Sequence, residues 1–406
     1  MAILTVNAGS SSLKFSLYPT QGADVLPQIL KGNIQGLEPG GTPLLDWSYA
    51  GRSQSRPVPA GNDPFAAALQ ALGQVLASLE GLPAITAVAH RVVHGGSRFT
   101  GSVEVDASIL AALSELNSLA PLHQPNNLMG IRAFQKVFPA LPQIACFDTA
   151  FHATVDALNH RFALPEDLAR QGLRRYGFHG LSYQFIMGAL MERSARSGGR
   201  VLMAHLGNGA SLCAALGGRS VATSMGFSAL DGLMMGTRSG TLDPGVMLYL
   251  LEQGWDHARL QDLLYRRSGL LGVSGISADM RRLRDSQDAA AHFAIDLFTH
   301  RVVQHAGAMV ATLQGLDVLA FSGGIGEHDT ALRAQVCNRL AWLGVHLDAA
   351  ANQAADGSQA RALHAPHSAV EVWVVPTDEG VVAAREAQTI LATRSSISTP
   401  KKNSPV

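Results

Sequence analysis

Apolar and polar positions form the same local pattern twice along the chain. In residues 3–17 an apolar run, a turn of small and polar residues, and an alternating apolar–polar run follow one another. Residues 201–216 also consist of an apolar run, a turn that holds Gly and Asn, and a second strand-like run, which here is mostly apolar. Asn and Gly tolerate the positive φ angles of tight turns, so each stretch predicts a β-hairpin. We expect two related halves, each opening on such a hairpin and facing the other across a cleft.

Helical and strand patterns alternate over the rest of the chain. Apolar residues at helical spacing predict helices over 65–76 and 291–313. Residues 40–64 are rich in Gly and Pro yet carry bulky apolar side chains, so we expect hairpins there. Strands that alternate with helices are typical of α/β proteins with mixed sheets. Short apolar runs predict further strands over 85–90, 143–147, 318–321 and 371–375.

Composition and charge narrow the class of protein. The chain has 406 residues, 47% of them hydrophobic, which is enough for two or three buried cores. Lys+Arg and Asp+Glu both number 31, and this balance argues against nucleic-acid or membrane-surface partners. The tail 395–406 is rich in Ser, Pro and Lys and is expected to be disordered.

Three well-separated cysteines, Cys146, Cys213 and Cys337, each lie in an apolar run. They fit buried, reduced thiols rather than a disulfide framework or a zinc site. The N-terminal residues are typical of a strand and not of a signal peptide, and no stretch approaches the roughly 20 apolar residues of a membrane span. We therefore expect a cytoplasmic protein.

Two segments each place one arginine among glycines. Arg91 lies in the segment 90–96, and Arg238 lies in the segment 234–240. Glycine lets the backbone approach a ligand closely, and a guanidinium group matches phosphate or carboxylate. A surface or capping role is the usual alternative for a single arginine. Together the two segments indicate a site that handles phosphate, and phosphoryl transfer in particular.

Other polar residues stand where the predicted strands end. The turn at 7–12 and Lys14 could surround phosphate, or could be an ordinary polar hairpin tip. Asp148 and Glu379 follow predicted strands, so they could hold Mg²⁺ or could serve as charges at helix N-termini. His179 could donate to a phosphoryl group, although a histidine in a turn is more often structural. The Gly-rich residues 322–326 predict a turn after the strand 318–321, and the stretch 322–327 is only a weak nucleotide-binding signal.

Seven segments in this order resemble the acetate kinase family, within the superfamily of acetate and sugar kinases, heat-shock chaperones and actin. The match runs from about Ile3 to Arg385. The matching segments are 7–14, 90–96, 120–123, 147–152, 175–180, 205–211 and 232–240.

The resemblance implies two ribonuclease H-like domains with mixed sheets flanking a central cleft. The N-terminal domain would span 1–150 and be joined by a C-terminal segment at about 381–394, and the other domain would span 151–380 and carry the nucleotide site. It further implies a homodimer and reversible transfer of the ATP γ-phosphoryl group to acetate or propionate. Mg²⁺, or alternatively Mn²⁺, would assist with ATP and ADP as substrates.

The resemblance also assigns roles residue by residue. It makes Arg91 and Arg238 clamps on the carboxylate and the transferring phosphoryl group, and His179 a donor to the transition state. Asp148 would organise the metal end, where Asn7 and Glu379 hold the cation. The acyl methyl group would lie among Val93, Leu122 and Phe178. The nucleotide would be bound by Lys14, His205, Gly207, Asn208, Gly209, Asp279, Met280, Arg281, Gly323, Gly324, Ile325 and Gly326.

The chain departs from the family pattern at three positions. Gly380 follows Glu379, where two adjacent glutamates are usual. Ala229 stands where proline is common and predicts a roomier acyl pocket, and Gln124 replaces the usual asparagine.

Alternative functions and reaction routes remain open at this level. A non-catalytic, actin-like nucleotide-binding protein would share the fold, although it would not need both arginines and His179. A dinucleotide oxidoreductase fails the six-residue glycine fingerprint, and no P-loop motif is present. We favour direct in-line phosphoryl transfer over a route through an aspartyl phosphate at Asp148.

Overall fold

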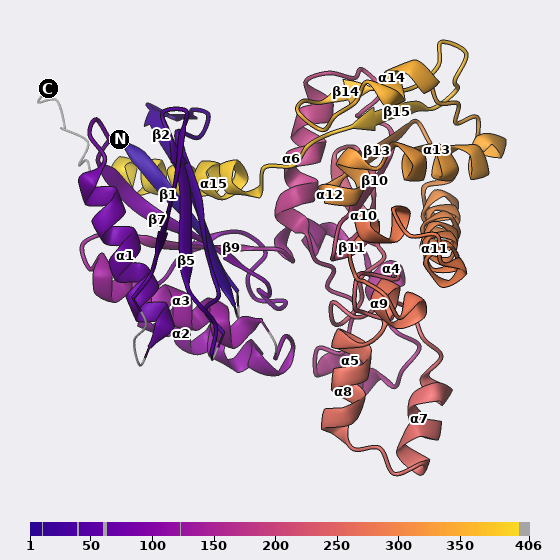
Figure 1. Cartoon of the computed structure of the whole chain (residues 1–406), viewed down its shortest axis with the longest axis horizontal. Helices are drawn as coiled ribbons and strands as arrows, with labels where there is room; N and C mark the ends of the chain where they lie inside the picture. The colour runs from indigo at the N-terminus through magenta and orange to yellow at the C-terminus, as the bar shows by residue number, and fades with distance from the viewer. Residues whose placement is uncertain (10, 39, 60–62, 122, 398–406) are drawn as a thin grey trace, which may run out of the picture. The chain divides into compact units, whose positions relative to one another are not determined.

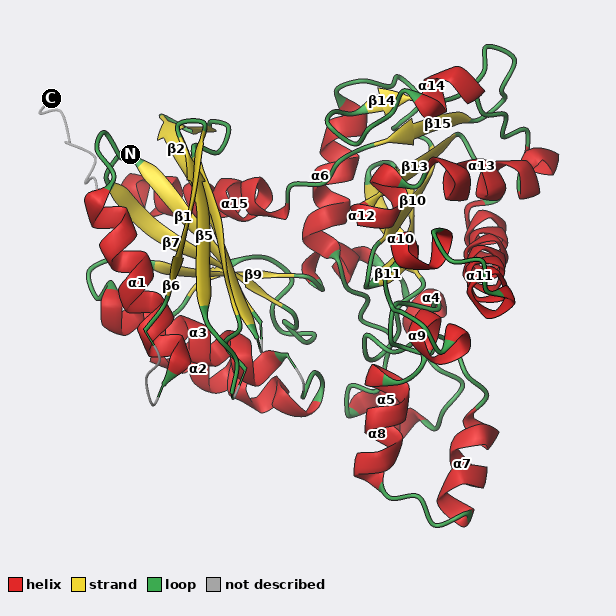
Figure 2. Ribbon diagram, viewed as in Figure 1, coloured by secondary structure: helices red, strands yellow, loops and turns green. Residues whose placement is uncertain are grey.

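The computed structural model describes residues 1–9, 11–38, 40–59, 63–121 and 123–397. The chain divides into two compact units. Unit 1 comprises Met1–Ala150 and the returning segment from Asp378, and unit 2 comprises Phe151–Thr377. Each unit holds one mixed sheet with helices packed on it (Figure 1, Figure 2). The two mixed sheets confirm the predicted α/β class.

The sheet of unit 1 has the strand order β6-β5-β4-β2-β1-β7-β9-β8, and β3 pairs with β2 outside this path. β1 runs antiparallel to β2 and parallel to β7, and β7 runs parallel to β9. The described elements are β1 Ala2–Ala8, β2 Ser12–Gln21, β3 Asp24–Val25, β4 Leu30–Gln35, β5 Leu44–Tyr49, β6 Arg52–Pro57, α1 Pro64–Ser78, β7 Ile85–Val92, β8 Val103–Glu104, α2 Ala107–Ser114, α3 Gln124–Val137, β9 Gln143–Phe147 and α15 Glu379–Ile397.

The sheet of unit 2 has the order β12-β11-β10-β13-β15-β14. The described elements are α4 Ala157–His160, α5 Glu166–Arg170, α6 Gly180–Met191, β10 Arg200–Leu206, β11 Ala210–Leu216, β12 Arg219–Thr223, α7 Pro244–Glu252, α8 His257–Arg266, α9 Gly269–Ser274, α10 Met280–Arg284, α11 Ala289–Leu313, β13 Val318–Ser322, α12 Gly323–His328, α13 Thr330–Arg339, α14 Ala349–Gln353, β14 Arg361–Ala362 and β15 Glu371–Val374. Short 3₁₀ helices span Glu115–Ser118, Ala150–Thr154 and Ala341–Leu343.

The predicted duplication is visible in the strand pairing. β10 is antiparallel to β11 and parallel to β13, which in turn is parallel to β15. The series β2-β1-β7-β9 of unit 1 therefore has the same order and directions as β11-β10-β13-β15 of unit 2. Both predicted hairpins are confirmed, as is a hairpin within 40–64, where β5 pairs with β6.

Successive side chains of β2 point to opposite faces of the sheet, so core residues and predicted site residues lie on different faces. Leu13, Phe15 and Leu17 pack with α1 in a buried cluster, so Lys14 points to the opposite face. That face also receives Asn7, the cross-strand partner of Lys14. On unit 2, α6 covers one face of the sheet and α11 contacts β10 and β11.

Two sequence predictions need correction. Gly323–Gly326 was expected to form a turn, but only Gly323 has a positive φ, of 75°, and all four residues lie in α12. The predicted disordered tail began at 395, but α15 continues to Ile397. Residues 398–406 lie outside the described residues.

The three cysteines are free and buried, as predicted. Burial raises the pKa of each thiol to about 12. Among the described residues, every helix is too short or too polar to cross a membrane.

Candidate active site

A buried ion pair joins the ends of two adjacent strands in unit 1. Arg91 lies near the end of β7, and Asp148 follows β9, which pairs with β7 in parallel. The Arg91 Nε donates to Asp148 Oδ1 at 3.0 Å, and Nη2 donates to Oδ2 at 2.7 Å. The Asp148 side chain is 2% exposed, whereas Arg91 is 22% exposed. Both carboxylate oxygens of Asp148 thus accept from Arg91, while part of the Arg91 side chain remains accessible to solvent.

A second carboxylate reaches the same guanidinium from the start of α15. Glu379 Oε2 lies 3.3 Å from the Arg91 Nε. Burial disfavours the charged form of Arg91, but the charges of Asp148 and Glu379 outweigh burial and raise the pKa of Arg91. Glu379 also lies in the first helical turn, so a role at the helix N-terminus is compatible with this contact.

A cavity of about 160 Å³ in unit 1 gathers several predicted residues. Asn7, Lys14, Arg91 and Glu379 all line it. Its other polar lining is mostly oxygen, from Thr5, Ser16, Tyr18 and Asp378. The carboxylates Asp378 and Glu379 and the Asn7 amide oxygen are ligands that fit Mg²⁺, which usually keeps water and phosphate as further ligands. Lys14 and Arg91 are cations and suit phosphate instead. Among the described residues, no three His, Cys, Asp or Glu side chains form a metal-binding cluster.

A larger cavity, of about 810 Å³, lies within unit 2. Its size is within the usual range for ligand sites of small molecules. The predicted residues that line it are Gly207, Asn208, Asp279, Met280, Arg281, Gly324 and Ile325. Ala278, in the segment 277–281 that resembles an adenosine site, lines it as well. Sequence reasoning missed five further lining residues, namely Arg284, Asp285, His328, Asp329 and Thr330.

Asn208 is held at this cavity by a glycine. The Gly236 amide donates to the Asn208 carbonyl at 3.0 Å. A Cβ at residue 236 would lie 1.9 Å from Asn208 Oδ1, far inside van der Waals contact. The glycine in the Arg238 segment is therefore needed so that the Asn208 side chain can lie against the backbone.

His179 is fixed by its backbone and by a hydrogen-bond chain. It precedes α6 with φ of 59°, in the left-handed region that is uncommon for non-glycine residues. Its Nδ1 lies 2.8 Å from Ser211 Oγ, and the Tyr183 hydroxyl lies 2.5 Å from the same oxygen. Its ring stacks on His205 at 4.3 Å between centroids. These contacts hold the ring while its Nε2 points toward Gly209.

Arg238 reaches the same glycine. A Cβ at residue 209 would lie 3.0 Å from Arg238 Nη2 and 3.2 Å from His179 Nε2. The other end of the guanidinium is anchored, because Nη1 donates to the Ala229 carbonyl at 2.8 Å. Unit 2 thus brings Arg238 and His179 together beside the Asn208 turn.

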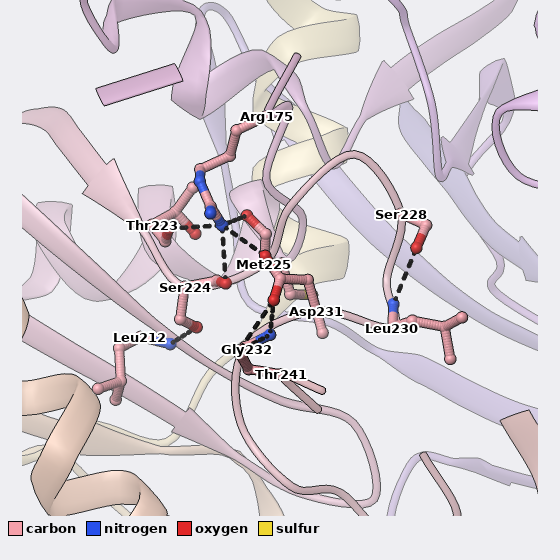
Figure 3. A network of polar contacts seen from close by, with 10 residues as sticks. All are labelled: Arg175, Leu212, Thr223, Ser224, Met225, Ser228, Leu230, Asp231, Gly232 and Thr241. Carbon is pink, nitrogen blue, oxygen red and sulfur yellow. Dashed lines mark hydrogen bonds and ion pairs between the residues drawn. The ribbon is translucent and has the colours of Figure 1, made fainter. Parts of the chain in front are cut away.

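The loop that carries Arg238 is fastened by a polar network (Figure 3). Arg175 Nη1 contacts the carbonyls of Ser224 and Met225 at 2.9 Å each, and Asp231 Oδ2 at 3.0 Å. Asp231 Oδ1 in turn accepts from the Gly232 amide and the Thr241 hydroxyl. The network ties the two ends of the loop together through Asp231 and Thr241. Within the loop, the bond to the Ala229 carbonyl positions the Arg238 guanidinium.

The remaining predicted site residues do not line the large cavity of unit 2. Lys14 belongs to the unit 1 cavity and not to the large cavity of unit 2. Gly323 and Gly326 are buried at α12, and His205 lies behind His179. The three residues of the predicted acyl pocket are not assembled within one unit. Val93 belongs to unit 1 and Phe178 to unit 2, and Leu122 lies outside the described residues.

Comparison with known proteins settles the family. A model of the acetokinase family matches residues 2–385. The chain belongs to the acetokinase family. The acetate kinase of Rhodopseudomonas palustris is 48% identical over 389 residues, which cover 94% of this chain and 96% of that protein.

Solved structures of this family share the fold. The crystal structure of Porphyromonas gingivalis acetate kinase has a TM-score of 0.86 at 36% identity, and covers 96% of this chain and 99% of that one. A propionate kinase from Francisella tularensis has a TM-score of 0.88 at 34% identity, with 95% and 98% coverage. This acetokinase chain thus has relatives named for two different carboxylates.

Two departures from the acetokinase pattern have a local structural context. Gln124 is fully buried, and its Nε2 donates to the His94 carbonyl at 3.0 Å. Ala229 supplies the carbonyl that anchors Arg238, a contact that proline would also permit because it too has a carbonyl. The third departure, Gly380, lies against Tyr18.

Removing Arg91 should destabilise unit 1, because Asp148 would be left buried without its ion-pair partner. We expect Arg91→Met to lower the free energy of unfolding by about 3 kcal/mol. Denaturant unfolding of the full chain measures this loss. Adding Asp148→Asn to that variant should recover part of it.

Arg394→Met is the matched control, since Arg394 pairs with Glu104 at 2.8 Å on the surface of the same unit. Exposed pairs contribute less than about 1 kcal/mol. Equal losses for Arg91→Met and Arg394→Met would contradict the structural role of the Arg91–Asp148 pair.

Proposed function

We propose that the chain catalyses reversible transfer of the ATP γ-phosphoryl group to acetate, which gives acetyl phosphate and ADP. Membership of the acetokinase family supports this activity. The observation that carries the proposal is the convergence of Arg238 and His179 on Gly209, beside Asn208. Asn208 lines a cavity large enough for a nucleotide, and both donors reach Gly209, the residue that follows Asn208 in the chain.

The physical problem of this reaction is the approach of two anions. Two unit charges at about 4 Å repel by roughly 4 kcal/mol at an effective dielectric constant of 20. A carboxylate is already deprotonated at neutral pH, so no general base is required. The catalyst needs positive charge and accurate positioning. Arg91 and Arg238 supply fixed positive charge, and His179 adds a donor at the phosphoryl group.

We infer that Asp148 acts as an anchor and not as a nucleophile. Both of its oxygens accept from Arg91, at 3.0 Å and 2.7 Å. The Asp148 side chain is also only 2% exposed, so a phosphorus atom would have little access to either oxygen. This arrangement favours direct in-line transfer over an aspartyl phosphate.

The oxygen atoms of Asn7, Asp378 and Glu379 in the unit 1 cavity favour the binding of a divalent cation there. Glu379 and Asn7 would hold Mg²⁺, with Mn²⁺ as an alternative. When bound, the cation would neutralise charge on the ATP phosphates. Arg91, fixed by Asp148, would keep Glu379 directed toward that end of the site.

The acceptor is proposed to be acetate, with propionate as a second substrate. Val93 favours a short acyl group, and Ala229 leaves more room than proline would. A hydroxylamine trap for acyl phosphates measures the rates with acetate, propionate and butyrate side by side. We expect acetate to be fastest and butyrate slowest, because each added methylene changes transition-state binding by about 1–3 kcal/mol.

Two outcomes of this assay would contradict the assignment. Faster turnover of propionate than of acetate would favour a propionate kinase. The lack of acyl hydroxamate with every acid, in protein that binds ADP, would favour a non-catalytic actin-like nucleotide-binding protein.

Arg238→Ala should lower kcat by about 10²–10⁴, as expected when a fixed donor to a developing charge is lost. The affinity for ADP should persist, since Arg238 is not among the residues that line the nucleotide cavity. Steady-state kinetics and ADP titration measure the two quantities. Arg267→Ala is the control, because Arg267 forms a surface pair with Asp262. A kcat of Arg238→Ala that matches this control would remove Arg238 from the mechanism.

We further propose that the protein is a homodimer located in the cytoplasm. The buried reduced thiols support a reducing compartment, and cell fractionation tests the location. An exposed apolar surface on and beside α7, formed by Leu242, Val246, Leu248, Tyr249 and Leu251, supports association through this helix. Within α7, no residue is buried.

Sedimentation equilibrium should give a dimer mass that Leu248→Asp shifts toward the monomer, because a charge would be buried at the contact. Trp342→Asp is the control, since Trp342 is also exposed in unit 2. A monomeric native protein, or equal dissociation of both variants, would refute a dimer contact at α7.

A further inference from the structure

Tyr18 is a buried aromatic residue at the metal end of unit 1 to which the mechanism assigns no role. It lies on the same side of β2 as Lys14 and lines the same 160 Å³ cavity. Its side chain is 1% exposed, and its hydroxyl donates to Asp378 Oδ1 at 2.6 Å. Burial, together with the charge of Asp378, raises the pKa of Tyr18, so the hydroxyl keeps its proton and remains a donor.

The acceptor of this bond also caps α15. Asp378 Oδ1 accepts from the Val381 amide at 3.0 Å, which satisfies a backbone donor in the first turn of the helix. Glu379 is the next residue, and its Oε2 reaches Arg91 at 3.3 Å. One carboxylate oxygen therefore links the Tyr18 hydroxyl to the turn from which Glu379 projects.

Gly380 explains how the tyrosine fits. A Cβ at residue 380 would lie 2.4 Å from the Tyr18 hydroxyl oxygen and 3.1 Å from two of its ring carbons. Gly380 is not among the glycines with positive φ, so its backbone would accept alanine. The glycine is needed because Tyr18 fills the space beside it. Gly380, which stands where a second glutamate is usual, thus leaves the space that Tyr18 occupies.

We propose that Tyr18 is a positioning residue for Glu379, which acts by fixing the start of α15 through Asp378 and which requires glycine at position 380. This inference rests on the proposed metal role of Glu379. The hydroxyl holds the cap, the cap sets the first helical turn, and that turn directs the Glu379 carboxylate.

Tyr18→Phe removes the hydroxyl and keeps the ring. Groups that orient a metal ligand usually change metal affinity by about 10–100-fold. We expect the Mg²⁺ concentration at half-maximal rate to rise by about tenfold or more, with a smaller change in kcat. Mn²⁺ binding to the full chain with ADP, measured by electron paramagnetic resonance, should weaken by a similar factor without any turnover.

Tyr49→Phe is the matched control, because the Tyr49 hydroxyl donates to the Glu80 carbonyl at 2.9 Å on the same sheet. It should leave Mn²⁺ binding unchanged. Equal Mn²⁺ affinities for Tyr18→Phe and Tyr49→Phe would overturn the inference.

Gly380→Ala tests the steric half of the inference. The new methyl group should displace the tyrosine hydroxyl and weaken Mn²⁺ binding, whereas Gly73→Ala in α1, where a Cβ meets nothing within 4 Å, should not. Both changes break the same contact, so their effects should not add. The double variant Tyr18→Phe/Gly380→Ala should therefore bind Mn²⁺ as tightly as the single variant with the lower Mn²⁺ affinity, or more tightly. Fully additive losses would overturn the pairing of Tyr18 with Gly380.

Glu379→Gln separates this inference from the proposed function. Unchanged Mn²⁺ affinity in Glu379→Gln would overturn the metal role itself. Weakened binding in Glu379→Gln together with normal binding in Tyr18→Phe would overturn only the positioning role. Hydrogen exchange at the Val381 amide should be faster in Tyr18→Phe than in Tyr49→Phe, which reports the helix cap without any metal.

Discussion

The two-point ion pair between Arg91 and Asp148 is the interaction on which the site of unit 1 depends. Adjacent parallel strands end beside each other, so a cation near the end of β7 meets an anion that follows β9. Asp148 is nearly inaccessible to water, and a buried charge without a partner would be expensive. Its burial fixes the guanidinium, and the exposed side of that guanidinium then meets Glu379 from α15. One constraint thus joins two strands to the returning helix.

Glycines shape both units as much as charged side chains do, because they have no side chain. Gly209 leaves space for Arg238 and His179, Gly236 leaves space for Asn208, and Gly380 leaves space for Tyr18. In each case a Cβ would crowd a functional or supporting side chain, because the chain approaches closely at that point. The abundance of glycine in the motifs therefore reflects specific contacts as well as tight turns.

Local sequence patterns predicted the elements whose residues interact with near neighbours. Period-two alternation was sufficient for the β1–β2 hairpin, and helical spacing was sufficient for α11. A turn was predicted at Gly323–Gly326 because glycine favours turns, but the segment is helical. Glu327 accepts from the Gly323 amide at 2.8 Å and so caps the start of α12. Propensity alone could not show this contact.

Side-chain partners distant in sequence could not be predicted. Ser211 holds His179 from 32 positions away, and Tyr18 bonds to Asp378 from 360 positions away. Arg91 and Asp148 were each recognised as candidates, but no pattern paired them with each other. Such pairs depend on strand order and register, which single-sequence periodicity does not fix. The resemblance to a known family supplied the residues, and the structure supplied their connections within each unit.

We propose that fixed positive charge lets the carboxylate attack phosphorus directly while Asp148 stays bound to Arg91. Transfer from ATP that is chiral at the γ-phosphorus tests this most directly, because one in-line displacement inverts the configuration. The account predicts inversion in the acetyl phosphate product. Net retention would show two displacements through a phosphorylated enzyme and would contradict the role assigned to Asp148.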